Sequence, residues 1–137
     1  MSKTDEVVNA MKGTQNMSKA KDGVFIHLSH GHEDPQRVLM AMNMAKMMSS
    51  DKDVLLYIDN NGVYTVLKNA EDITYKEFPP LSQLLSELKN SSVKVTVCPD
   101  CLKAANKTTA DVLDWVTIAD TDKFFSFTEG RIITLDY

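Results

Sequence analysis

Five short segments of the chain have the side-chain pattern of β-strands. Residues 23–29 and 53–59 are near-continuous apolar runs, as expected for strands that are covered on both faces of a sheet. In residues 93–97 valine alternates with polar side chains, the period of two that is typical of a strand. Residues 115–119 and 131–136 complete the set, so we predict five strands.

Segments with helical spacing separate these strands. Asp34 and Pro35 are a favourable N-cap and first helical residue, and they predict a helix to about Ser49. A Pro-Pro pair precedes leucines at helical spacing in residues 81–88, which predicts a second helix. Because helices and strands alternate, we predict an α/β fold, a three-layer α/β/α sandwich around a five-stranded, mainly parallel sheet. Shorter helices are expected over residues 63–68, 99–106, 108–114 and 121–130.

The first 22 residues differ from the rest of the chain. They are polar and of mixed charge, with only a weak helical patch. We expect residues 1–22 to form a mobile N-terminal tail, or a short helix that needs a partner to pack on. Residues 23–137 are long enough to form one α/β domain with its own core.

The composition excludes several classes of function. The net charge is −4 and the chain has no run of lysine and arginine, which argues against a nucleic acid or an anionic membrane as partner. No apolar run approaches the roughly 20 residues of a membrane span, and residues 7–11 are too short for the core of a secretory signal. We therefore expect a cytoplasmic protein. Glycine-rich nucleotide-binding motifs are missing, so we predict no cofactor.

The two cysteines of the chain lie in one turn, Cys98-Pro99-Asp100-Cys101, directly after the strand at residues 93–97. Pro99 suits the first position of a helix, which places Cys98 at or next to the N-cap, near free backbone N–H groups. A thiol in this position ionises more easily, and the thiolate is the nucleophile. Cys101 lies on the same helical turn and is close enough to bridge. We interpret Cys98 as a nucleophile with Cys101 as its resolving partner; the alternative is a pair of small buried apolar side chains.

Three histidines surround the end of the first strand. The ends of parallel strands lie along one edge of the sheet, so we expect His30 to be a polar neighbour of the Cys98 sulfur. A zinc site formed by cysteines and histidines is a rival interpretation. The chain has no second Cys-x-x-Cys and no paired histidines at zinc-binding spacing, so we predict no metal. His27 lies within an apolar strand and is expected in the core.

These motifs, in this order, resemble the DsrE/DsrF-like family, small α/β proteins of bacterial and archaeal sulfur metabolism. The resemblance covers roughly residues 23–137. It rests on the loop His-Gly-His-Glu-Asp-Pro at residues 30–35, on residues 54–63, and on the strand and turn at residues 95–102. Family members place a sulfur-carrying cysteine directly after this strand, where this chain has Cys98.

The resemblance implies a homo-oligomer, commonly a trimer or hexamer, that hands sulfane sulfur between protein thiols. The chain departs from the family at one point. Many members follow the helix with an Arg-Gly pair, whereas here the sequence is Ala105-Asn106-Lys107, so an arginine that would stabilise the thiolate is missing.

The sequence therefore predicts a sulfur-relay protein in which Cys98 carries a persulfide and Cys101 modulates it. Such a protein is a sulfurtransferase-like carrier, and the sequence does not decide whether it turns over catalytically. Its partners would be donor and acceptor protein thiols. The alternative is a non-catalytic oligomeric binding or assembly module, with a small-ligand or metal pocket at the strand ends. The helix at residues 35–49 is apolar almost all round, so it is either a central core helix or a contact with another subunit. With the aromatic residues near the C-terminus, it favours a homo-oligomer.

Overall fold

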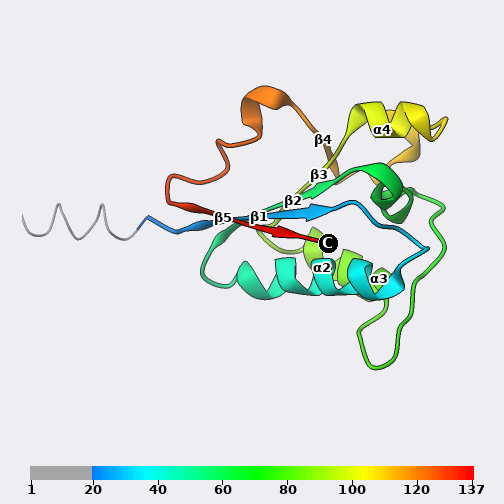
Figure 1. Cartoon of the computed structure of the whole chain (residues 1–137), viewed down its shortest axis with the longest axis horizontal. Coiled ribbons are helices and arrows are strands. Elements are labelled where there is room, and N and C mark those ends of the chain that lie inside the picture. The colour runs from blue at the N-terminus through cyan, green and yellow to red at the C-terminus, as the bar shows by residue number, and fades with distance from the viewer. Residues whose placement is uncertain (1–19) are drawn as a thin grey trace, which may run out of the picture.

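Parallel strands run side by side through the centre of the computed structural model, which describes residues 20–137 (Figure 1). All neighbouring strands pair in parallel, in the order β4-β3-β2-β1-β5. The five-stranded parallel α/β sheet predicted from the sequence is thereby confirmed. Residues 1–19, most of the expected N-terminal tail, lie outside the described residues. The strands are β1 (Gly23–Leu28), β2 (Asp53–Ile58), β3 (Lys94–Val97), β4 (Thr117–Ile118) and β5 (Ile132–Asp136).

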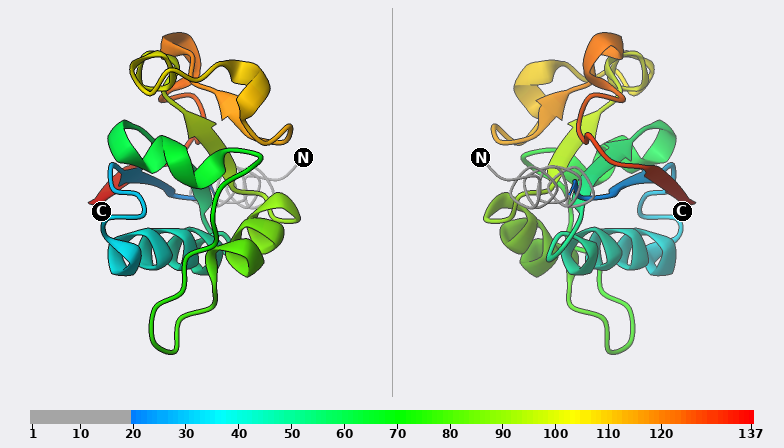
Figure 2. Two further views of the ribbon diagram at one scale, coloured as in Figure 1. Left: turned by 90° about the vertical axis from the view of Figure 1, so that its right-hand side faces the viewer. Right: turned by 90° about the vertical axis from the view of Figure 1, so that its left-hand side faces the viewer.

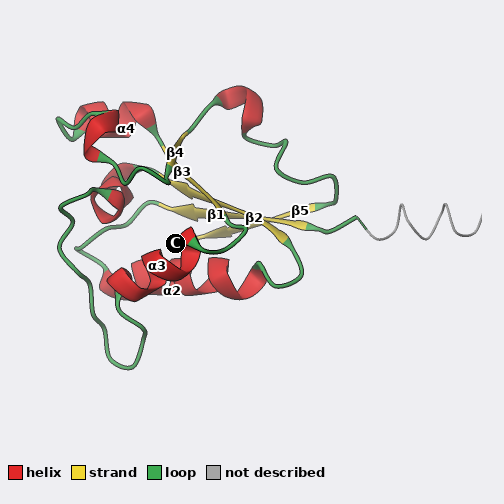
Figure 3. Cartoon of the chain, turned by 180° about the vertical axis from the view of Figure 1, so that it is seen from behind, coloured by secondary structure: helices red, strands yellow, loops and turns green. Residues whose placement is uncertain are grey.

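The helices α2 (Pro35–Met48) and α3 (Leu81–Lys89) cover one face of the sheet (Figure 3). Alternate strand residues point to this face and are buried against the helices, because side chains alternate between the two faces of a strand. Asp34 caps α2, since its carboxylate accepts a hydrogen bond from the Arg37 N–H at 3.1 Å. The core between sheet and helices includes Val24, Ile26, Leu28, Leu56, Ile58, Val95, Leu39, Met42, Leu84 and Leu88.

Short elements and loops cover the other face (Figure 2). They include the 3₁₀ helix η1 (Asn60–Val66), the helix α4 (Pro99–Ala104) and the chain between β4 and β5. Phe25 and His27 point to this face and are half-buried, whereas their neighbours in β1 are buried. The sequence predicted β1 to be covered on both faces; one face is covered fully and the other only in part.

The segment between β4 and β5 is not the helix expected over residues 121–130, so that prediction was wrong. A single 3₁₀ turn, η3 (Thr121–Lys123), forms there. The Phe124 ring then packs on the sheet, with its centroid 5.1 Å from the Phe25 ring and 4.6 Å from the Tyr57 ring. Burial of the aromatic ring on the open sheet face, together with the bond from Thr128 Oγ1 to Asp53 Oδ2 at 3.0 Å, holds the chain in an irregular path.

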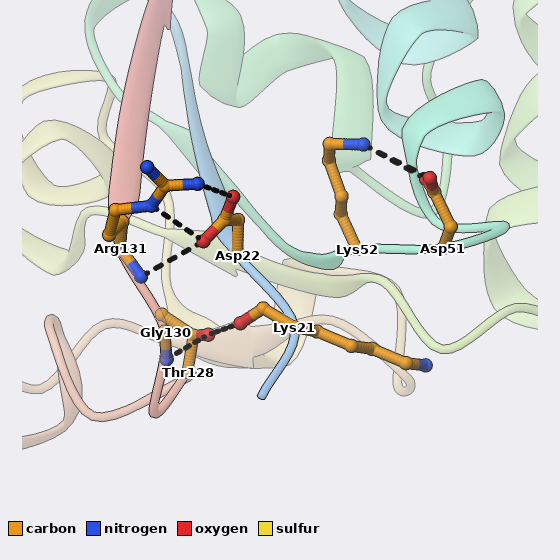
Figure 4. A network of polar contacts seen from close by, with 7 residues as sticks. All are labelled: Lys21, Asp22, Asp51, Lys52, Thr128, Gly130 and Arg131. Atoms are coloured by element: carbon orange, nitrogen blue, oxygen red, sulfur yellow. Dashed lines mark hydrogen bonds and ion pairs between the residues drawn. The ribbon is translucent and has the colours of Figure 1, made fainter. Parts of the chain in front are cut away.

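The start of the described chain is bound to the start of β5 (Figure 4). Arg131 donates to the Asp22 carboxylate through Nη2 at 2.9 Å and Nε at 3.2 Å. The hydrogen bond from Arg131 holds the pKa of the Asp22 carboxyl below its usual range. Thr128 Oγ1 also lies 2.9 Å from the Lys21 carbonyl oxygen, so its one proton is shared between this oxygen and Asp53 Oδ2. It accepts a hydrogen bond from the Gly130 N–H at 3.1 Å. Lys21 and Asp22, which the sequence assigned to the tail, are therefore attached to the domain.

Candidate thiol site

Cys98 lies where β3 ends and α4 begins. It is the N-cap of α4, with Pro99 as the first helical residue, as the sequence predicted. The Cys98 N–H donates to the Ile58 carbonyl at 2.9 Å, which ties the turn to the end of β2. The Cys98 Sγ accepts a hydrogen bond from the Cys101 N–H, with 3.4 Å between nitrogen and sulfur. Asn106 follows the helical segment with a φ of 57°, a left-handed conformation that asparagine tolerates.

The two free thiols differ in acidity. Partial burial disfavours the Cys98 thiolate, but hydrogen bonds from the Cys101 thiol and N–H, the Tyr57 hydroxyl and the Asp100 N–H outweigh it. The pKa of Cys98 therefore lies below its ordinary value. Burial and the neighbouring Cys98 sulfur raise the pKa of Cys101, against a hydrogen bond from the Asn60 N–H. At neutral pH, Cys98 is thus the more ionised of the two.

Tyr57 of β2 is a site residue that the sequence interpretation missed. Its ring lies between Phe124, with centroids 4.6 Å apart, and His27, with centroids 5.8 Å apart. Burial and the hydrogen bond to Cys98 hold the pKa of the Tyr57 hydroxyl well above its usual range. The hydroxyl therefore keeps its proton and donates to the sulfur. The alternation of side chains along β2 predicts the face of the sheet on which Tyr57 lies. Its contact with Cys98 depends on which strands are neighbours, which this alternation does not reveal.

His27 is not the core histidine expected from the sequence, because its side chain is 30% exposed and lies between two carboxylates. Its Nδ1 makes a hydrogen bond with Asp136 Oδ1 at 3.1 Å. Its Nε2 is 2.8 Å from Asp59 Oδ1, but that contact lacks the alignment of a hydrogen bond. Asp59 follows β2 and Asp136 ends β5, so the three side chains meet where the parallel strands end.

His30 lies in a polar hollow of about 480 Å³ next to α4. The hollow forms where β1 and β2 end, and its lining includes Cys101 but not Cys98. The structure thus brings His30 together with Cys101. His32 lies elsewhere, with its Nε2 2.8 Å from the Glu71 carbonyl oxygen. The lining of the hollow also includes Glu33, Asn61, Tyr64 and Ala104.

A zinc site needs several nitrogen, sulfur or carboxylate ligands in one place. Within residues 20–137, no group of three or more His, Cys, Asp or Glu side chains could hold a metal ion. Over the same residues, no helix is both long enough and apolar enough to cross a membrane.

These features define a class of protein: a small parallel α/β domain with a cysteine pair where its third strand ends. The chain belongs to the DsrE/DsrF-like family, whose sequence profile matches residues 22–129. The family expected from the motifs is thereby confirmed.

Two solved structures have the same fold, although their sequence identity to this chain is low. A protein of unknown function, MTH1491, from Methanobacterium thermoautotrophicum superposes with a TM-score of 0.57 and 19% identity over 82% of this chain and 98% of that one. The ychN protein from E. coli superposes with a TM-score of 0.58 and 16% identity over 84% of this chain and 99% of that one. A comparison with curated proteins found no match.

Proposed function

We propose that this protein carries sulfane sulfur as a persulfide on Cys98 and passes it to a partner thiol. The observation that carries the proposal is the set of hydrogen-bond donors around the Cys98 sulfur, which favours its thiolate. Membership of the DsrE/DsrF-like family, which is related to sulfur-relay proteins, supports the same chemistry.

Loading is a transfer of one sulfur atom without net oxidation. The Cys98 thiolate attacks the terminal sulfur of a donor persulfide, R–S–SH. A bond forms from Cys98 Sγ to that sulfur, the donor S–S bond breaks, and the donor leaves as the thiolate RS⁻. A persulfide is a stronger acid than its parent thiol, so the donors that hold the Cys98 thiolate also hold the persulfide anion.

Cys101 limits how long the cargo persists when no acceptor is present. Its thiolate can attack Cys98 Sγ, which forms the Cys98–Cys101 disulfide and releases HS⁻. Because the pKa of Cys101 is raised, most of this thiol is protonated at neutral pH and the discharge is slow. This is the modulating role that we assign to Cys101.

The cellular setting belongs to the same proposal. We infer a sulfurtransferase-like carrier in the cytoplasm, a homo-oligomer whose partners are donor and acceptor protein thiols. The second candidate is a non-catalytic binding module, which the hollow beside Cys101 favours. Sulfur loading separates the two candidates, because a binding module has no need of a persulfide.

Intact-mass analysis after exposure to polysulfide tests the proposal. The wild type and the Cys101→Ser variant should gain the mass of one sulfur atom, whereas Cys98→Ser should gain none. The Cys101→Ser variant should retain its sulfur longer, because the disulfide route is closed. Loading that survives Cys98→Ser would show that the wrong cysteine is assigned, and no loading in any form would leave the binding module as the better account.

A further inference from the structure

We propose that the hollow beside Cys101 binds a small amino-acid thiol of the cysteine class, and that Cys101 delivers sulfane sulfur to it. The inference rests on the proposed function, and it adds a small-molecule acceptor to the protein thiols proposed there. It also assigns Cys101 a second role, that of an outlet.

The two thiols face different surroundings. Cys98 lies against the Tyr57 hydroxyl, on the partly covered face of the sheet. Cys101 lines the hollow of about 480 Å³ where β1 and β2 end. Ligands of open parallel α/β sheets bind at this end of the strands. A molecule in the hollow therefore meets Cys101, while Cys98 Sγ lies 3.4 Å from the backbone nitrogen of Cys101.

Glu33 gives the hollow a fixed negative charge. Its carboxylate accepts two contacts from the Gly31 N–H, at 2.7 and 3.0 Å, and one from Asn61 Nδ2 at 3.1 Å. Burial opposes the charge, but these hydrogen bonds hold the pKa of the Glu33 carboxyl below its usual range. Within residues 20–137, no lysine or arginine forms an ion pair with Glu33. A preorganised carboxylate without a cationic partner suits the ammonium group of a ligand.

A second charge of opposite sign lies nearby. Lys107 lines an adjoining hollow of about 420 Å³, which shares Glu33, Asn61 and Tyr64 with the first. Glu33 and Lys107 thus bring a carboxylate and an ammonium group to two adjoining hollows, and an amino acid carries the same two charges. His30 and the Tyr64 hydroxyl add hydrogen-bonding groups, and the small Ala104 side chain leaves room for the ligand. A thiol-bearing amino acid bound between these charges has its sulfur free to face Cys101.

The sulfur atom passes from Cys98 to the bound ligand in two steps, each of which balances in atoms and electrons. The Cys101 thiolate attacks the terminal sulfur of the Cys98 persulfide, so that Cys101–S–SH forms and Cys98 leaves as a thiolate. The ligand thiolate, RS⁻, then attacks the terminal sulfur on Cys101; RS–SH forms and the Cys101 thiolate is released. Neither step needs an oxidant or a reductant. If the Cys101 thiolate attacks Cys98 Sγ, the inner sulfur of the persulfide, the Cys98–Cys101 disulfide forms instead. A bound acceptor thiol therefore draws sulfur away from disulfide formation.

Discharge kinetics of the loaded protein test the inference. Protein loaded with polysulfide is freed of excess donor and mixed with L-cysteine or with N-acetylcysteine, which lacks the ammonium group, at matched thiolate concentrations. We expect saturable discharge by L-cysteine, about tenfold faster than by N-acetylcysteine at low concentration, which corresponds to ~1.4 kcal/mol. Glu33→Gln should remove the difference, and the control Glu129→Gln, on an exposed residue outside the hollow, should keep it. Equal, unsaturable discharge by both thiols would overturn the inference.

Two further variants separate the roles of the residues. Ala104→Leu fills the hollow without removing a polar group, and it should abolish saturation by L-cysteine while Cys98 still loads. Cys101→Ser should also load, but L-cysteine should discharge it no faster than N-acetylcysteine does. Fast, saturable discharge of either variant would contradict the assigned site.

A binding measurement without sulfur chemistry keeps this inference distinct from the proposed function. L-serine has the charges of cysteine but no thiol. Its titration into the unloaded wild type should shift the His30 ring resonances in NMR spectra, and Glu33→Gln should weaken the effect about tenfold. If Cys98 never loads but serine binds, only the proposed function fails. If Cys98 loads and serine shifts nothing, only the amino-acid site fails.

Discussion

At the scale of single residues, a tyrosine on one strand helps to lower the pKa of a cysteine that follows the next strand. Tyr57 and Cys98 are 41 positions apart in the sequence, and the parallel pairing of β2 with β3 brings them together. A hydrogen bond to a charged acceptor contributes about 1.5–3 kcal/mol, and less where water competes. The Tyr57 hydroxyl therefore matters to the chemistry of Cys98 although it takes no part in the transfer itself.

Removal of this hydroxyl should make Cys98 less acidic. In Tyr57→Phe the ring stays in the aromatic cluster but no longer donates, so we expect the pKa of Cys98 to rise. Alkylation of Cys98 at pH 7 should slow by roughly threefold to tenfold, and the rate should recover at higher pH. The pH profile of iodoacetamide labelling, read by mass spectrometry in the Cys101→Ser background, measures this.

The matched control is Tyr75→Phe, since the Tyr75 ring packs on Phe78 in the loop before α3 and is not among the groups that shift the Cys98 pKa. Its labelling profile should equal that of the parent. A profile of Tyr57→Phe that also equals the parent would show that the hydroxyl does not act on Cys98.

Site residues were predictable from the sequence where their chemistry depends on near neighbours in the chain. The positions of Cys98 and Pro99 follow from one strand-to-helix turn, and the structure has that turn. Tyr57 and Glu33 could not be predicted in the same way. Their contacts join separate strands and loops, and spacing along the chain gives the face of a residue but not its neighbour on the next strand.

At the scale of elements, α2 and α3 formed as predicted, whereas the short helices expected over residues 108–114 and 121–130 did not. Only the 3₁₀ turns η2 (Thr109–Asp111) and η3 form there. Asp34 and Pro35 begin α2, and the paired prolines precede α3. Between Thr121 and Gly130, a capping residue is present but three phenylalanines follow it. Burial of an aromatic ring on an open sheet face outweighs helix propensity, which amounts to less than about 1 kcal/mol per residue.

The start of α3 should depend on Asp72. The Asp72 carboxylate accepts hydrogen bonds from the Ser82 N–H at 2.8 Å and Oγ at 2.9 Å, which ties the preceding loop to the helix. Asp72→Ala should lower the free energy of unfolding at pH 7 by about 1 kcal/mol, as loss of a helix cap does. Urea denaturation followed by circular dichroism measures the change.

This contribution should depend on pH in one direction. Burial opposes the charge, but the hydrogen bonds from Ser82 and Ile73 hold the Asp72 pKa below its ordinary value of 3.8. The added stability is complete above about pH 4 and is lost as the pH falls through the lower folded pKa. The gap between wild type and Asp72→Ala should therefore narrow at pH 3. If the difference in unfolding free energy between wild type and Asp72→Ala stayed constant from pH 7 to pH 3, the charge of Asp72 would be irrelevant to stability. Asp122→Asn, on an exposed residue, serves as the control.

At the scale of the whole molecule, apolar surface remains at one edge of the sheet. Phe125 is 66% exposed and packs on Phe25 of β1, the strand next to the edge strand β5. In β5 itself, Ile132 and Ile133 are 38% and 49% exposed. Most apolar residues of α2 are buried within the chain, although Met47 is 60% exposed. Of the two surfaces considered from the sequence, the aromatic end of the chain is therefore the better candidate for a subunit contact.

We expect the protein to form a homo-oligomer through this surface. In sedimentation-velocity experiments at micromolar concentration, the wild type should be larger than a monomer. Phe125→Asp should weaken association at least about tenfold, because it places a charge in an apolar contact. Met47→Gln, which changes an exposed apolar residue of α2, should leave the assembly intact. A wild type that sediments as a monomer would refute the homo-oligomer, and an effect confined to Met47→Gln would move the contact to α2.

The strand order also has a consequence for how the chain folds. Within residues 20–137, β1 is the first strand in chain order, yet it lies between β2 and β5, and its contacts with β5 span 109 positions. Pairing across so long a stretch is slow, because the loop must close before the contacts form. One edge of β1 therefore stays open through most of synthesis, with its backbone groups unpaired. The segment that closes this edge also brings Asp136 to His27, so completion of the sheet and completion of that carboxylate–histidine contact are one event.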